Sequence, residues 1–141
     1  MTETLTLSKK LYTDVINHAK SIAPIESCGY LAGKDNHVEM FYPMTNVDNS
    51  PEHFSFDPKE QFSVVKQARQ NNQKLLAVYH SHPESPARLS EEDIKLFNDP
   101  DPVYIIVSLL DDNAVMKGFK IKKPNENEIE IKQVNLTIQG E

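Results

Sequence analysis

The sequence predicts an α/β domain in which helices flank a mixed, largely antiparallel sheet. Three observations support this fold class. Apolar residues recur at helical spacing in some segments, they alternate or run continuously over strand lengths in others, and short polar turns separate the segments. The 141 residues contain no repeat, low-complexity segment or Gly/Ser-rich linker, so a single domain over residues 1–141 is expected.

The N-terminal part of the chain is expected to form a helix followed by a β-hairpin. Ser8 is a suitable N-cap for a helix from about Lys9 to Ile22, because the apolar residues of that segment recur at helical spacing. Cys28–Ala32 and Val38–Met44 have strand character, and a polar turn at residues 34–36 lies between them. These two strands are therefore predicted to pair with each other.

A short strand, a helix and a buried strand are expected next. His53–Phe56 alternates as a strand does, and Asp57 can cap a helix that begins with a proline and ends near Asn71. Leu75–Tyr79 is nearly continuously apolar, which is typical of a central strand covered on both faces. The two histidines that follow are thus expected at its carboxyl end, where open α/β sheets hold their sites.

The remainder of the chain is expected to contain a short helix and three strands. Ser90 can cap a helix that reaches about Phe97, where a segment rich in aspartate and proline stops it. Val103–Leu110 is predicted to be a second buried strand. Val115–Ile121 and Ile129–Ile138 alternate between apolar and polar residues, so they are predicted to be strands with one exposed face.

The charge and composition narrow the classes of function. Fifteen basic and twenty-one acidic residues give a formal net charge of −6, which opposes binding to nucleic acid or anionic lipid. No apolar run approaches the roughly 18–20 residues that span a bilayer. The N-terminus has no signal-peptide pattern, and the single cysteine, Cys28, excludes an internal disulfide, so a cytoplasmic protein is expected.

Two histidines and an aspartate form a candidate metal site. His80 and His82 lie two residues apart, so on a strand both side chains point to the same side. Asp93 follows eleven residues after His82, in the first turn of the predicted helix, and the intervening loop can bring it back to the strand end. Two imidazoles and a carboxylate suit zinc, and three protein ligands leave a fourth position for water. We therefore expect one Zn²⁺ per chain in an open, catalytic site.

A zinc hydrolase also needs a group that carries protons and a donor to the oxyanion of the tetrahedral intermediate. Glu26 is a candidate general acid/base, because it lies where a loop enters a strand that could neighbour the histidines. Spacing alone leaves Glu84, Glu91 and Glu92 open as alternatives, since they are closer to the histidines in sequence. Ser90 is a candidate oxyanion donor, because its hydroxyl proton stays free while its oxygen caps the helix.

Each of these motifs taken alone has a simpler structural explanation. A His-x-His pair is common, and Ser-x-x-Asp is more often only a capped helix start. Their combination directly after a buried strand favours a metal site. A zinc deaminase would require His-x-Glu followed by Pro-Cys-x-x-Cys, which a chain with one cysteine cannot supply.

The same residues resemble the JAMM (MPN+) metalloprotease motif. His80-Ser81-His82-Pro83, Ser90 and Asp93 have its spacing, and Glu26 precedes them in a Glu-x-Cys-Gly segment. The likeness to small stand-alone prokaryotic members covers residues 26–33, 53–58, 79–93 and 104–109. It implies a cytidine-deaminase-like α/β fold with zinc bound by the two histidines and Asp93, with Glu26 as general acid/base and Ser90 as oxyanion donor.

The resemblance also implies a substrate class. Members of this family cleave peptide or isopeptide bonds, often after the C-terminal Gly-Gly of a ubiquitin-like protein. The small bacterial members resemble peptidases acting on sulfur-carrier proteins in sulfur metabolism, so such a carrier is the expected partner. Between Asp93 and Val103 there is room only for a short helix and a proline turn, which argues against polyubiquitin linkage specificity. The alternative is a non-catalytic MPN-type scaffold module, although all five motif positions are intact.

Overall fold

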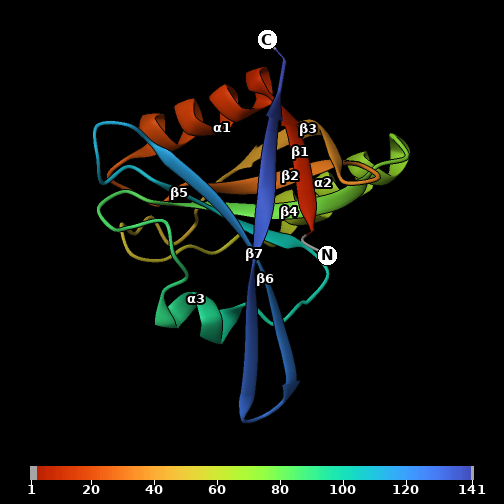
Figure 1. Cartoon of the computed structure of the whole chain (residues 1–141). Helices are drawn as coiled ribbons and strands as arrows, with labels where there is room; N and C mark the ends of the chain where they lie inside the picture. Colours follow the sequence, from red (N-terminus) through yellow and green to blue (C-terminus); the bar gives the residue numbers. More distant parts are fainter. Residues whose placement is uncertain (1–2, 141) are drawn as a thin grey trace.

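The computed structural model describes residues 3–140, which form a mixed β-sheet with helices packed on both of its faces (Figure 1). Local sequence signals account for most of the element boundaries. In chain order the elements of this part of the chain are β1 (Thr4–Ser8), α1 (Lys9–Ile22), β2 (Cys28–Lys34), β3 (His37–Met44), α2 (Pro58–Gln70), β4 (Lys74–His82), α3 (Glu91–Leu96), β5 (Val103–Ser108), β6 (Val115–Asn125) and β7 (Glu128–Gln139).

Strand β4 lies inside the sheet, which explains its nearly continuous apolar sequence. β2 pairs with one side of β4 in antiparallel orientation, and β5 pairs with the other side in parallel orientation. β3 follows beyond β2, while β6 and β7 follow beyond β5, all through antiparallel pairs. β1 runs parallel to β7 and also pairs with β3 at one position, so it connects the two ends of the sheet. The predicted fold class, α/β with a mixed sheet, is confirmed.

Helices α1 and α2 pack on opposite faces of the sheet, and each begins at its predicted cap. The Ser8 hydroxyl accepts a hydrogen bond from the backbone N–H of Leu11, and the Asp57 side chain accepts one from Lys59. The buried face of α1 packs over Leu31, whereas that of α2 packs over the neighbouring β2 residues, whose side chains point the other way. Among residues 3–140, no helix is both long and apolar enough to cross a bilayer.

Two predictions about strands in the N-terminal half need correction. Strand β1 was not predicted, although Leu5 and Leu7 alternate with polar residues and are both buried. The predicted strand at His53–Phe56 is wrong, because that segment makes only an isolated bridge between Phe56 and Asn46. Part of its backbone bonds to a side chain instead: Ser55 N–H donates to Asn46 Oδ1 at 3.2 Å. Alternation over four residues therefore does not distinguish a strand from an extended loop here.

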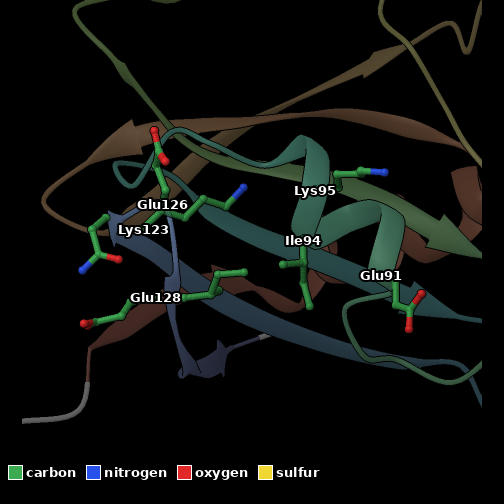
Figure 2. A pocket seen from close by; sticks show the side chains of 8 residues that line it. Glu91, Ile94, Lys95, Lys123, Glu126 and Glu128 are labelled. Carbon is green, nitrogen blue, oxygen red and sulfur yellow. The ribbon is translucent and has the colours of Figure 1, made fainter.

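The hairpin of β6 and β7 is longer than predicted and projects beyond the body of the sheet (Figure 1). Its outer part is polar apart from Ile129 and Ile131, which are 50% and 44% exposed. A hollow of about 750 Å³ lies between this hairpin and α3, and Ile94, Ile129 and several lysine and glutamate side chains line it. Figure 2 shows Ile94 and Lys95 on α3 and Lys123, Glu126 and Glu128 on the hairpin. None of the lining residues belongs to the His80–His82–Asp93 group, so this hollow is separate from the candidate metal ligands.

The fully buried Ile105 in β5 provides a test of how the core stabilises this fold. Ile105→Ala is expected to lower the free energy of unfolding by about 2–5 kcal/mol, because it removes buried methylene groups and leaves a cavity. The matched control is Ile129→Ala in the exposed hairpin, which should cost about 1 kcal/mol or less. Urea unfolding followed by circular dichroism measures both values. Equal losses for the two variants would contradict the placement of the core.

Candidate metal centre

His80, His82 and Asp93 converge at the end of β4 with their ligand atoms within 4.8 Å of one another. The Nε2 atoms of the two histidines lie 3.1 Å apart. One carboxylate oxygen of Asp93 lies 3.2 Å from His80 Nε2, and the other lies 3.2 Å from His82 Nε2. All three side chains are buried. The structure therefore brings together the three residues that the sequence singled out as metal ligands.

The start of α3 and the loop before it orient two of these side chains. Ser90 and Asp93 form a capping box, in which Asp93 N–H donates to Ser90 Oγ and Ser90 N–H donates to Asp93 Oδ2, both at 3.0 Å. His82 Nδ1 lies 2.9 Å from the carbonyl oxygen of Pro86. A carbonyl only accepts, so Nδ1 carries the proton and the Nε2 lone pair faces the cluster. This is the arrangement in which a neutral histidine binds a metal.

His80 is fully buried between two aromatic rings. Phe54 stacks on its imidazole with ring centroids 4.9 Å apart, and the Phe97 ring packs against it edge-on at 5.5 Å. Burial lowers the pKa of His80, which favours the neutral form that binds metals. Its Nδ1 has no hydrogen-bond partner among the described residues. Neither phenylalanine was proposed as a site residue from the sequence, since nothing local marks which aromatic residues will reach β4.

The charge balance of the cluster is set by contacts between its own members. Burial alone would raise the pKa of Asp93, but the contacts of its carboxylate with the His80 and His82 rings hold that pKa well below its usual range. Burial opposes protonation of His82, yet its bonds to Asp93 and Pro86 outweigh that effect and raise its pKa. Asp93 is thus an ionised carboxylate at neutral pH, available as an anionic ligand.

The chemistry and spacing of these donors fit zinc. Ligands at about 2.0–2.2 Å from a tetrahedral zinc ion lie roughly 3.3–3.6 Å from one another. The nitrogen and oxygen atoms of the cluster are already 3.1–3.2 Å apart, close to that spacing. Two facing imidazole nitrogens at such a distance need either a proton or a cation between them. No further histidine, cysteine or carboxylate joins the group within the described chain, so only three protein ligands are available.

Glu26 lies beside this cluster because of the pairing between β2 and β4. Cys28 is in register with His80, and Ser81 N–H donates to the Ser27 carbonyl at 3.0 Å, so the chain just before β2 runs past His82. The Glu26 side chain is buried, with Oε1 lacking a hydrogen-bond partner among residues 3–140. Burial raises its pKa to about 8, against an opposing effect of His82.

The three acids that sequence spacing left open are placed differently. Glu84, Glu91 and Glu92 are all exposed, whereas Glu26 is only 4% exposed. Burial shifts the pKa of a carboxyl group towards neutrality, and of these four acids only Glu26 is buried. The geometry therefore favours Glu26 over these three as the proton carrier.

The raised pKa of Glu26 implies a pH-dependent stability for the protein without bound metal. The folded state holds a proton at Glu26 between pH 4.5, its ordinary pKa, and about 8, whereas the unfolded chain releases it. This stabilisation is complete below pH 4.5 and is lost as the pH rises through about 8. Glu26→Gln should therefore lose less stability than the wild type between about pH 5 and 9. Urea unfolding in the presence of a metal chelator measures this. If the assignment were wrong, the wild type and Glu26→Gln would lose the same stability over this pH range.

The single cysteine and the other three histidines of the chain have structural surroundings. Cys28 is fully buried in β2, and burial raises the pKa of its thiol to about 12, so it is not an activated nucleophile. His18 lies on α1, with Nδ1 3.2 Å from the Tyr79 hydroxyl. His37 is exposed at the turn into β3, and His53 is exposed beside Asp48. None of these histidines belongs to the metal cluster.

A comparison with known families identifies the chain. The model of the prokaryotic homologs of the JAB domain matches residues 8–122, which include every residue of the candidate centre. The chain belongs to this JAB family. The resemblance to the JAMM (MPN+) motif in the sequence is thereby confirmed.

Several characterised proteins are similar to this JAB-family chain. It is 34% identical over 109 residues to the CysO-cysteine peptidase of Mycobacterium tuberculosis, an alignment that covers 76% of this chain and 75% of that protein. It is 31% identical over 97 residues to the desampylase of Pyrococcus furiosus, with 69% of each chain covered. By its name, the first of these relatives is a peptidase.

Solved structures support the JAB-type fold. The solution structure of a protein from Desulfitobacterium hafniense is 40% identical, with a TM-score of 0.85 over 97% of this chain and 94% of that one. A JAB1/MPN domain protein from Archaeoglobus fulgidus has a TM-score of 0.57 and covers 96% of this chain and 98% of its own. At 21% identity, the second likeness concerns the fold alone.

Proposed function

We propose that this JAB-family protein is a zinc-dependent metallopeptidase. Its substrate is the peptide or isopeptide bond after the C-terminal Gly-Gly of a ubiquitin-like, sulfur-carrier protein. The observation that carries the proposal is the buried His80–His82–Asp93 cluster with, beside it, a buried carboxyl oxygen of Glu26 that has no hydrogen-bond partner within residues 3–140. The related CysO-cysteine peptidase and desampylase support the substrate class.

The chain supplies separate groups for holding zinc, moving protons and stabilising negative charge. His80, His82 and Asp93 would hold the ion, which would act as a Lewis acid and lower the pKa of water to about 7. Glu26 takes the proton released when water attacks the scissile carbonyl and returns it to the leaving amine nitrogen. The Ser90 hydroxyl donates a hydrogen bond to the oxyanion that forms on the former carbonyl oxygen.

The environment of Glu26 suits both halves of this proton transfer. Its raised pKa of about 8 lets it hold a proton near neutrality, and a cation beside it would favour ionisation and move the pKa down. A general acid/base works best when its pKa is near the working pH. An exposed glutamate, with a pKa near 4, would be a weaker base for the first step and would hold no proton for the second.

A groove beside the cluster supports a protein substrate with an extended tail. It measures about 1000 Å³ and is lined by a mixture of aromatic, apolar and polar side chains from β2, β4, β5, α2, the end of α3 and the neighbouring loops. Phe54 and Phe97 line this groove and also pack against His80, so these two rings lie between the groove and the metal cluster. A diglycine tail has no side chains that would clash with these rings, so we expect the protein to require glycine there for steric reasons.

Ser90→Ala tests the oxyanion role. Ser90 accepts from Asp93 N–H, which leaves its hydroxyl proton available to the substrate. The substitution should reduce kcat about 10²–10³-fold, the usual loss for one oxyanion donor, and should cost about 1 kcal/mol through the lost cap. Ser90→Thr keeps the hydroxyl and the cap, so it should retain most of the activity. A Ser90→Ala enzyme with wild-type kcat would remove Ser90 from the mechanism.

The function itself is tested by mass spectrometry of a tailed carrier. Zinc-loaded protein is incubated with a ubiquitin-like carrier that bears one or more residues after its Gly-Gly, and with the same carrier ending in Gly-Ala before the extension. Release of the extension from the first carrier, and a large loss of rate on the second, is the expected result. Carrier binding without any cleavage would instead support the scaffold alternative.

A further inference from the structure

The loop between β3 and α2 is organised around one buried side chain, Asn46, which is 9% exposed. Its amide makes four hydrogen bonds of 3.0–3.2 Å, all to the backbone. Nδ2 donates to the carbonyl oxygens of Glu26 and His53, both at 3.0 Å. Oδ1 accepts from the N–H groups of Asp48 at 3.0 Å and Ser55 at 3.2 Å. Asn46 thus ties the loop to the chain at Glu26.

These contacts use the full hydrogen-bonding capacity of an asparagine side chain. A primary amide has two N–H donors and an oxygen with two lone pairs, and all four have partners here. Aspartate has nearly the same shape, but it lacks both donors and would face two carbonyl oxygens. Alanine would leave two buried carbonyls and two N–H groups without their partners. The amide chemistry, in addition to the size of the side chain, is therefore required at this position.

The backbone of Glu26 is held from both directions by this loop. Its N–H donates to the carbonyl of Ser50 at 2.9 Å, and its C=O accepts from Asn46. Oε1 of its side chain, by contrast, is buried without a hydrogen-bond partner among residues 3–140. Because no bond holds that oxygen, the direction of the carboxyl group depends on where the main chain is fixed.

The same loop also covers the metal cluster. Phe54, which stacks on His80, lies between His53 and Ser55, and each of those neighbours has a backbone group bonded to Asn46. Fixing this stretch therefore fixes the ring that shields His80 from solvent. The Asn46 amide thus links the backbone of Glu26 to the stretch that carries Phe54, although Asn46 lies on neither β2 nor β4.

We propose that Asn46 is a positioning residue that aims the Glu26 carboxyl group at the reacting atoms by clamping its main chain. This role rests on the proposed function, in which Glu26 carries the proton. A proton carrier misplaced by about 1 Å can lose on the order of 10² in rate. Binding of the carrier, which is proposed to use the groove on the outer surface, depends much less on the direction of the Glu26 carboxyl group.

The experiment compares Asn46→Asp and Asn46→Ala with Val15→Ala in the remote α1 core, a variant that reports destabilisation alone. For each zinc-loaded protein, kcat and KM on a tailed carrier, zinc content, melting temperature and amide hydrogen exchange at Glu26 are measured. Both Asn46 variants should lose about 10²-fold in kcat, with KM changed less than about threefold and zinc retained. Their Glu26 amide should exchange at least about tenfold faster, whereas Val15→Ala should change neither kcat nor that exchange rate.

Three outcomes would overturn the proposal. One is an unchanged Glu26 exchange rate in both Asn46 variants, and another is a rise in KM with kcat intact. The third is a loss of kcat in Val15→Ala as large as that of Asn46→Ala at a similar melting temperature. If the wild type cleaves no diglycine-tailed carrier, the proposed function fails. The amide exchange rates at Glu26 still test whether Asn46 holds its backbone, since that measurement needs no substrate.

Discussion

Glu26→Gln is expected to lower kcat by about 10²–10⁴-fold while the protein keeps its zinc. Glutamine has the shape of glutamate but cannot take up or release a proton in this pH range. The three cluster residues are untouched by the change, so metal binding should persist. KM should change little, because the substitution affects the proton transfer rather than the contacts of the carrier.

The measurement pairs steady-state kinetics on a tailed carrier with zinc content after dialysis. Glu92→Gln is the matched control, because this residue is an exposed glutamate whose charge also acts on Glu26. It should leave kcat within about threefold of the wild type. Wild-type turnover in Glu26→Gln would assign the proton transfer to another group. A loss of zinc in that variant would instead place Glu26 among the ligands.

Asp93→Ala is expected to weaken zinc binding by at least about 10²-fold and to abolish cleavage at ordinary zinc concentrations. Even residues that only support metal ligands typically contribute 10–100-fold to affinity, and Asp93 is itself a proposed ligand. Its loss also leaves His80 Nε2 and His82 Nε2 facing each other without the carboxylate between them. Asp93→Ala therefore weakens metal binding and also removes the negative charge that faces the two histidines.

Competition with a zinc-binding dye measures this affinity, and Glu91→Ala in the same helical turn is the control. Glu91 is exposed and makes no contact with the cluster, so its removal should leave zinc affinity within about twofold. Zinc should also raise the melting temperature of the wild type and of Glu91→Ala, but not of Asp93→Ala, since only a folded site binds it. Full zinc affinity in Asp93→Ala would show that the third ligand is another residue.

The metal cluster was predictable because its geometry is local. The period of a strand places His80 and His82 on one side, and the Ser90 cap places Asp93 in the first turn of α3. The helices were predictable for the same reason, since their caps and apolar spacing lie within a few residues. These features depend on short stretches of chain, and the structure agrees with them.

The parts that could not be predicted depend on contacts between distant segments. Glu26 reaches the cluster only because Cys28 pairs with His80, more than fifty positions along the chain. The segment at His53–Phe56 looks like a strand, but its backbone is bonded by the Asn46 amide, which no local pattern reveals. Family resemblance supplied the role of Glu26, while residue spacing alone left three other acids open.

The projecting hairpin of β6 and β7 has a consequence for how relatives of this protein can diverge. Residues 122–131 contribute no side chain to the three buried clusters of the core, and none to the ligand set. Insertions, deletions or charge changes there are expected to leave the core and the ligand residues in place. Natural variation in this appendage can therefore proceed independently of the chemistry, and the hairpin is a natural point for grafting new sequences onto an unchanged enzyme.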